Sequence, residues 1–177
     1  MNIPNLITIA RIALVPIFIW LLAIEPSTIS WQRFLAIFFF VLAASTDGLD
    51  GMIARRTNKV TNLGKILDPI ADKALIGGAL IVLSILGEID WWVTILILVR
   101  EIGITLYRIA VVKREVISAT LSGKLKTIFQ AVAIGCVMAP FETWIPLWSY
   151  LELSLIYLAL AATLISGYQF LRAATKK

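Results

Sequence analysis

The chain has 177 residues, of which 60% are hydrophobic and only 15% are charged, with a formal net charge of +5 and a mean hydropathy of +0.92. Soluble domains carry about 25% charged residues, so this composition excludes an ordinary soluble protein and indicates an integral membrane protein. The single cysteine, Cys136, excludes a scaffold held together by internal disulfides.

Apolar segments long enough to cross a bilayer, about 17 to 25 residues each, follow one another with short polar breaks. Because lipid cannot satisfy backbone hydrogen-bonding groups, each segment is expected to be a helix. Six are predicted, at residues 6–24, 31–55, 65–86, 91–112, 125–140 and 147–171, of which the fifth is the shortest. The sequence therefore predicts an all-α integral membrane protein with one membrane domain over residues 1–177.

The N-terminal segment has no basic residue before its apolar run and carries Arg11 within it, unlike a cleavable signal peptide. We expect it to begin at the membrane interface and to continue into the first spanning helix.

Basic and acidic residues are divided unequally between the predicted connections. The breaks near residues 25, 88–90 and 142–152 hold acids, with Arg33 as their base, whereas most other bases lie at Arg11 and in residues 55–73, 113–126 and 172–177. The positive-inside rule places the basic side in the cytoplasm. Both termini are then cytoplasmic, which requires an even number of spans and fits six. We therefore expect a multi-pass protein of the cell (inner) membrane with its active site facing the cytoplasm.

Tryptophans lie near the predicted outer ends of the helices, as in the aromatic belt of membrane proteins; they are Trp31, Trp91, Trp92, Trp144 and Trp148. The bases lie next to the membrane, so their expected partners are anionic lipid or an anionic substrate rather than nucleic acid.

Four aspartates gather near the cytoplasmic ends of the second and third predicted helices. At about 100° per residue, Asp47 and Asp50 share one face of the second helix. Asp68 and Asp72 share one face of the third, and a short loop makes the two helices antiparallel neighbours. The same faces carry small residues or a neighbouring base, namely Gly51, Ala54, Arg55, Gly64 and, if the third helix begins early, Thr61.

Four converging carboxylates would repel one another strongly unless a cation lay between them. Carboxylates are hard ligands that suit Mg²⁺, Mn²⁺ or Ca²⁺ rather than zinc, and the chain has no histidine. Four of them are enough for a pair of divalent ions, an arrangement used in phosphoryl chemistry. The alternative is that the acids form interfacial ion pairs with nearby bases, which are Arg55, Arg56, Lys65 and Lys73.

These residues resemble the signature of a known family. The chain reads "DGLDGMIAR" at residues 47–55 and, after eight further residues, "GKILDPIAD" at residues 64–72. Every fixed position matches the CDP-alcohol phosphatidyltransferases, membrane enzymes in which an alcohol hydroxyl attacks the β-phosphorus of a CDP-linked lipid and CMP leaves. The resemblance implies that Asp47, Asp50, Asp68 and Asp72 hold two divalent ions, Mg²⁺ or Mn²⁺. It also implies that Asp72 is the general base for the acceptor hydroxyl.

The resemblance also implies a binding site for the CDP-lipid. The N-terminal "NLITIAR" resembles the family's Asn-x-x-Thr-x-x-x-Arg opening but has one residue fewer before Arg11. The implied set is Asn5, Thr8, Asp47, Gly51, Ala54, Arg55 and Thr61.

Four bases later in the chain are candidates for binding the acceptor alcohol. Arg100 and Arg108 lie eight residues apart on nearly one face of the fourth helix, and Lys124 and Lys126 lie at the start of the fifth. An arginine inside a membrane is costly unless it faces a polar cavity or a partner. One interpretation is that the four bases clamp the phosphate of an anionic acceptor. The other is that Arg100 pairs with Glu101 or an aspartate and that the lysines bind lipid headgroups.

The pair "RE" at residues 100–101 followed by a second arginine, Arg108, and the segment "GKLKTIFQ" at residues 123–130 are similar to those of family members that use sn-glycerol 3-phosphate. The predicted function is therefore transfer of a phosphatidyl group from CDP-diacylglycerol to this acceptor. Alternatives are the same chemistry with phosphatidylglycerol, as in cardiolipin synthesis, or with serine or an inositol compound. An ion or anion transporter is the alternative of another class, although its charges would be distributed through the bilayer depth.

Family resemblance further implies a homodimer. Gly77 and Gly78 in the third helix would permit close helix packing, either in a dimer interface or in a contact within the chain.

Overall fold

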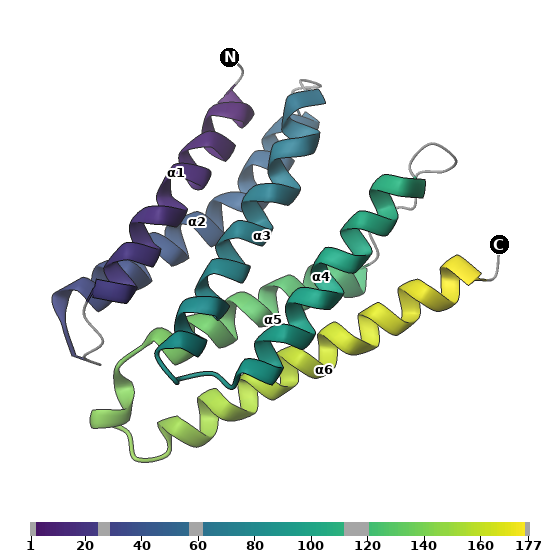
Figure 1. The fold of residues 1–177 in the computed structure, drawn as a ribbon. Coiled ribbons are helices and arrows are strands. Elements are labelled where there is room, and N and C mark those ends of the chain that lie inside the picture. Colours follow the sequence, from purple (N-terminus) through teal and green to yellow (C-terminus); the bar gives the residue numbers. More distant parts are fainter. Residues whose placement is uncertain (1–2, 25–28, 57–61, 112–120, 176–177) are drawn as a thin grey trace. The chain divides into compact units, whose positions relative to one another are not determined.

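A computed structural model of the protein describes the backbone of residues 3–24, 29–56, 62–111 and 121–175 (Figure 1). Within these ranges, the side chains of residues 3–5, 47–56, 62–69, 108–111, 121–125, 143 and 174–175 lie outside the described set.

Every regular element in the described backbone is helical. The elements are α1 (Ile3–Ile24), α2 (Trp31–Arg56), α3 (Asn62–Ile85), α4 (Trp91–Val111), α5 (Leu121–Met138), the 3-10 helix η1 (Phe141–Thr143) and α6 (Trp148–Thr175). The prediction of an all-α chain is confirmed. The largest differences in the ends are at α5, which begins four residues before the predicted position 125, and at α6, which ends four residues after the predicted position 171.

The chain divides into two compact units, which are described separately below. The first comprises Met1–Glu88 with Met138–Pro140, and the second comprises Ile89–Val137 with Phe141–Lys177.

In the first unit, α1 packs against both α2 and α3, and α2 contacts α3. Phe18 of α1 meets Phe40 of α2 edge to face, with ring centroids 5.8 Å apart, and both are almost completely buried. Gly78 of α3 allows a close approach to α1, because a Cβ placed there would lie 2.6 Å from Cδ1 of Ile19. Of the two uses expected for Gly78, the structure therefore shows a contact within the chain.

The end of α3 forms a C-terminal cap that sets the position of Glu88. Gly87 has a φ of 79°, a left-handed conformation that glycine adopts without strain. The N–H of Glu88 donates to the carbonyl of Leu83 at 2.9 Å and that of Gly87 to the carbonyl of Ser84 at 3.2 Å, the pattern of a Schellman motif. This turn brings the carboxylate of Glu88 to Arg33.

Arg33 is a base on the predicted outer side, where the other charged residues named above are acids, and the structure shows that it pairs with one of them. Its Nη1 and Nη2 donate to Oε1 and Oε2 of Glu88 at 2.6 and 2.5 Å, and its Nε donates to the carbonyl of Met138 at 2.8 Å. The Arg33 side chain is 2% exposed. The guanidinium is thus buried with a two-pronged carboxylate partner, the geometry that best offsets the cost of burying a charge.

In the second unit, α4 packs against α6. Trp92 of α4 stacks on Tyr157 of α6 with ring centroids 5.8 Å apart. Val93 and Ile97 of α4 are almost completely buried. The indole Nε1 of Trp148, at the start of α6, donates to the carbonyl of Cys136 in α5 at 3.3 Å.

The exterior of the described helices is far more apolar than that of a soluble protein, and polar side chains are found among the buried residues. Each α-helix exposes large apolar side chains, for example Trp20, Phe38, Ile85, Val99, Ile128 and Leu158. Buried positions include polar and charged residues, for example Thr8, Arg11, Arg33, Lys126, Gln130 and Thr163. An apolar exterior on this scale is unfavourable in water and favourable in lipid.

Two helical stretches in the described part of the chain are long and apolar enough to cross a membrane, Leu6–Ile24 and Trp148–Ala173. Trp31–Thr46 and Lys126–Met138 are apolar but shorter. These stretches support membrane association, while the six-span topology stays a prediction.

Candidate active site

The four aspartates of the predicted metal site lie in two contacting helices of the first unit. Asp47 and Asp50 belong to α2, and Asp68 and Asp72 belong to α3. Both helices continue through these positions, so the spacings of three and four residues place the Cα atoms of each pair along one side of its helix. The side chains of Asp47, Asp50 and Asp68 lie outside the described residues, whereas Asp72 is half-buried.

The donor set fits hard divalent cations, because it consists of carboxylates and the chain has no histidine. Among the described side chains, no three of His, Cys, Asp or Glu lie together as possible metal ligands. Three of the four predicted ligands are outside that set, so the metal site stays a prediction.

Thr8 is the member of the predicted CDP-lipid set whose side chain the structure describes. It lies in α1 and is 1% exposed, as is Arg11 one turn further along the helix. The side chains of the other members lie outside the described residues, namely Asn5, Asp47, Gly51, Ala54, Arg55 and Thr61.

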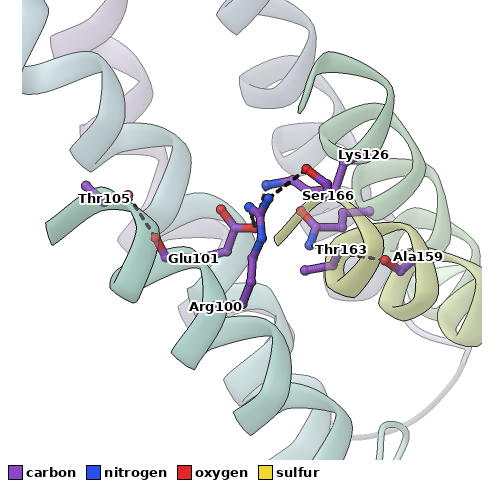
Figure 2. A network of polar contacts seen from close by, with 8 residues as sticks. Arg100, Glu101, Thr105, Lys126, Ala159, Thr163 and Ser166 are labelled. Carbon is purple, nitrogen blue, oxygen red and sulfur yellow. Dashed lines mark hydrogen bonds and ion pairs between the residues drawn. The ribbon is translucent and has the colours of Figure 1, made fainter. Parts of the chain in front are cut away.

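Two of the four predicted phosphate-binding bases meet at one carboxylate in the second unit (Figure 2). Nη1 of Arg100 in α4 donates to Oε1 of Glu101 at 2.9 Å, and Nζ of Lys126 in α5 donates to the same oxygen. The three side chains are 13%, 12% and 8% exposed for Arg100, Glu101 and Lys126. The pairing of Arg100 with Glu101 was one of the alternatives left open by the sequence, and Lys126 joins it. The side chains of Arg108 and Lys124 lie outside the described set.

Helix α6 also contacts Arg100. Nη2 of Arg100 donates to Oγ of Ser166 at 2.7 Å. A Cβ on Gly167 would lie 3.2 Å from Cγ and 3.3 Å from Nε of Arg100, so the arginine side chain lies across this glycine. Neither residue is among the predicted site residues; the signal for them in the sequence is a pair of small residues, Ser-Gly, within the long apolar run of the sixth helix.

A second polar contact joins α5 and α6 near this charged cluster. Nε2 of Gln130 donates to Oγ1 of Thr163 at 2.8 Å. That hydroxyl donates to the carbonyl of Ala159 at 2.6 Å (Figure 2). Gln130 and Thr163 are 3% and 0% exposed. Buried polar groups that are hydrogen-bonded in this way hold helices in a defined register.

Together, the fold and these side chains define an all-helical, membrane-associated protein with an acidic helix pair in one unit and an arginine–lysine cluster in the other. The family model described as CDP-alcohol phosphatidyltransferase matches residues 1–165. The chain belongs to this family, and the resemblance stated from its residues is confirmed.

Curated relatives match the chain over most of its length. A protein of Mycobacterium tuberculosis (strain H37Rv) named "Probable phosphatidylglycerophosphate synthase" is 48% identical over 141 residues, which are 80% of this chain and 68% of the relative. Two relatives are named CDP-diacylglycerol–glycerol-3-phosphate 3-phosphatidyltransferase. The one from Bacillus subtilis (strain 168) is 36% identical, covering 96% of this chain and 93% of its own. The one from Escherichia coli (strain K12) is 35% identical, covering 98% and 94%.

Proposed function

We propose that the protein transfers a phosphatidyl group from CDP-diacylglycerol to sn-glycerol 3-phosphate, forming phosphatidylglycerophosphate and releasing CMP. The observation that carries this proposal is that relatives bearing this activity in their names match nearly the full length of both chains. The meeting of Arg100 and Lys126 at the carboxylate of Glu101 supports an acceptor that carries a phosphate, since two neighbouring cations suit an anionic group.

In the proposed reaction, a hydroxyl oxygen of glycerol 3-phosphate forms a bond to the β-phosphorus of the CDP-lipid while the bond from that phosphorus to CMP breaks. Asp72 accepts the proton that the hydroxyl loses. Asp47, Asp50, Asp68 and Asp72 would hold two Mg²⁺ or Mn²⁺ ions. When bound, such ions supply positive charge beside the phosphate oxygens.

The CDP-lipid is proposed to bind residues of the first unit. Gly51 and Ala54 leave room for the nucleotide because they have little or no side chain, and Arg55 offers two parallel donors to a phosphate. The buried position of Thr8 in α1 supports a polar site inside this unit. Asn5, Asp47 and Thr61 complete the proposed set. The acceptor phosphate is assigned to bases of the second unit, Arg100, Arg108, Lys124 and Lys126.

For the chain as a whole, we propose six membrane spans with both termini and the active site on the cytoplasmic side of the cell (inner) membrane. The basic connections support this orientation. We also propose that the chain is one functional domain, which the family match across both units supports, and that it forms a homodimer.

The test is an assay of the purified protein in detergent with CDP-diacylglycerol, Mg²⁺ or Mn²⁺ and one alcohol at a time. We expect CMP release with glycerol 3-phosphate, loss of activity with a chelator, and recovery when Mg²⁺ or Mn²⁺ is added back. Release of CMP with serine, an inositol compound or phosphatidylglycerol, but not with glycerol 3-phosphate, would contradict the proposed acceptor. Ion flux in liposomes that persists in the double variant Asp47→Asn, Asp68→Asn would favour a transporter instead.

A further inference from the structure

Two residues of helix α6, Ser166 and Gly167, contact Arg100. Neither belongs to the aspartate signature or to the basic segments described above. Ser166 accepts a hydrogen bond from Nη2 (Figure 2). Gly167 lies against Cγ, Cδ and Nε of the same side chain. Ser166 is 8% exposed, so its hydroxyl is held inside the unit rather than at the surface.

The guanidinium of Arg100 is therefore held at both of its terminal nitrogens. Glu101 holds Nη1, Ser166 holds Nη2, and Nε is buried with no hydrogen-bond partner among the described residues. A guanidinium has five N–H groups. Two of these are used in the contacts above, so three have no acceptor among the described residues: one on each terminal nitrogen and the Nε–H. A phosphate can accept two N–H groups of one guanidinium in the two-pronged manner.

Gly167 leaves room for this placement. Any larger residue would put a Cβ 3.2 Å from Cγ of Arg100, closer than ordinary van der Waals contact. The arginine side chain would have to shift by a few tenths of an ångström away from this position, which would strain the hydrogen bond between Nη2 and Ser166.

The charges and helices involved favour a binding role. Glu101 is shared between a cation of α4 and a cation of α5, while Ser166 comes from α6. Residues of three helices thus hold the two cations at one carboxylate. Holding binding groups in place before the ligand arrives increases the affinity for the ligand more than it changes the chemical step.

We infer that Ser166 and Gly167 of α6 are positioning residues of the acceptor site, which hold the guanidinium of Arg100 in the orientation that receives the phosphate of glycerol 3-phosphate. The inference rests on the proposed function and adds to the acceptor site a helix that the sequence motifs do not include.

The first test compares Ser166→Ala with Ser154→Ala in steady-state assays. Ser154 lies on the same helix, is exposed, and donates only to the carbonyl of its own helix at Tyr150. Loss of a hydrogen bond to a charged group predicts that Ser166→Ala raises the KM for glycerol 3-phosphate about tenfold or more. The kcat and the KM for CDP-diacylglycerol should stay within about twofold. Ser154→Ala should behave as wild type, and Ser166→Thr, which keeps the hydroxyl, should restore most of the affinity.

The second test compares Gly167→Ala with Gly135→Ala. A Cβ at Gly135 meets nothing within 4 Å, so this variant controls for adding a methyl group to a helix. Gly167→Ala should raise the KM for glycerol 3-phosphate selectively, and Gly135→Ala should not.

The outcomes separate this inference from the function on which it rests. Wild-type protein that turns over glycerol 3-phosphate, with an unchanged KM in both Ser166→Ala and Gly167→Ala, would overturn the inference alone. So would equal losses in both KM values and kcat accompanied by a lower unfolding temperature, because those indicate a purely structural role. Wild-type protein that releases CMP only with another alcohol would overturn the proposed acceptor and the inference together.

Discussion

At the scale of single residues, Asp72 combines two proposed roles. It is the aspartate of the signature whose side chain is described, and it lies half-buried between the buried Ala71 and the half-buried Lys73. A half-buried carboxylate can both approach a bound substrate and remain shielded from bulk water, which suits a general base.

Asp72→Asn is expected to lower kcat by about 10²- to 10⁴-fold, the usual contribution of a general base. The KM for CDP-diacylglycerol should change little, because removing the base affects the transition state more than the bound substrate. The measurement is CMP release as a function of CDP-diacylglycerol concentration. Asp90→Asn, the same change at an exposed aspartate, should leave both constants unchanged. If Asp72→Asn weakened CDP-lipid binding as much as turnover, Asp72 would act chiefly as a metal ligand.

At the scale of elements, the cap at the end of α3 and the start of α2 are joined by one ion pair. Glu88 reaches Arg33 because Gly87 turns the chain after α3, and Arg33 is almost completely buried. An arginine buried in this way depends on its carboxylate, since a lone charge in a low-dielectric interior is strongly unfavourable.

Glu88→Ala is therefore expected to lower the free energy of unfolding by about 3 kcal/mol, at the low end for a broken buried pair because Glu88 is 22% exposed. Unfolding by heat or denaturant in detergent micelles measures this change. Glu142→Ala, at an exposed acid in η1, should have little effect. The double variant Arg33→Met, Glu88→Leu should recover much of the loss, because no charge is then buried. A double variant as unstable as Glu88→Ala would show that packing, and not the ion pair, dominates this region.

At the scale of the whole molecule, the apolar exterior and the asymmetry of charge determine how the chain is expected to lie in the membrane. Trp31, Trp91, Trp92 and Trp144 are all exposed, as an aromatic belt at the interface requires. With six spans, the connection that contains Asp90 faces outward and the C-terminal tail faces the cytoplasm.

Single cysteines in a Cys136→Ala background test this topology. In intact bacterial cells treated with a membrane-impermeant maleimide, we expect Asp90→Cys to be labelled and Lys177→Cys to be labelled only after permeabilisation. The Cys136→Ala protein has no cysteine and provides the unlabelled baseline. Labelling of both positions from the same side would contradict an odd number of crossings between them.

The sequence by itself determined the helices and the pairing of aspartates along them. Hydropathy and helical periodicity are properties of neighbouring residues, so the ends of α1 to α6 could be predicted to within about four residues. Asp47 with Asp50, and Asp68 with Asp72, needed only their spacing and continuous helices. The family signature lies in the same local stretch, which is why the resemblance could be stated from residues 47–72 and was confirmed by the family match.

Only the tertiary structure decided which buried charges meet. Arg33 and Glu88 are 55 positions apart, and Arg100 and Ser166 are 66 apart. No periodic pattern links such positions, because their contact depends on how whole helices pack and on where a glycine leaves room. The sequence therefore could not distinguish whether Arg100 is paired or oriented for a ligand. The structure shows it held by both Glu101 and Ser166, over a glycine of α6.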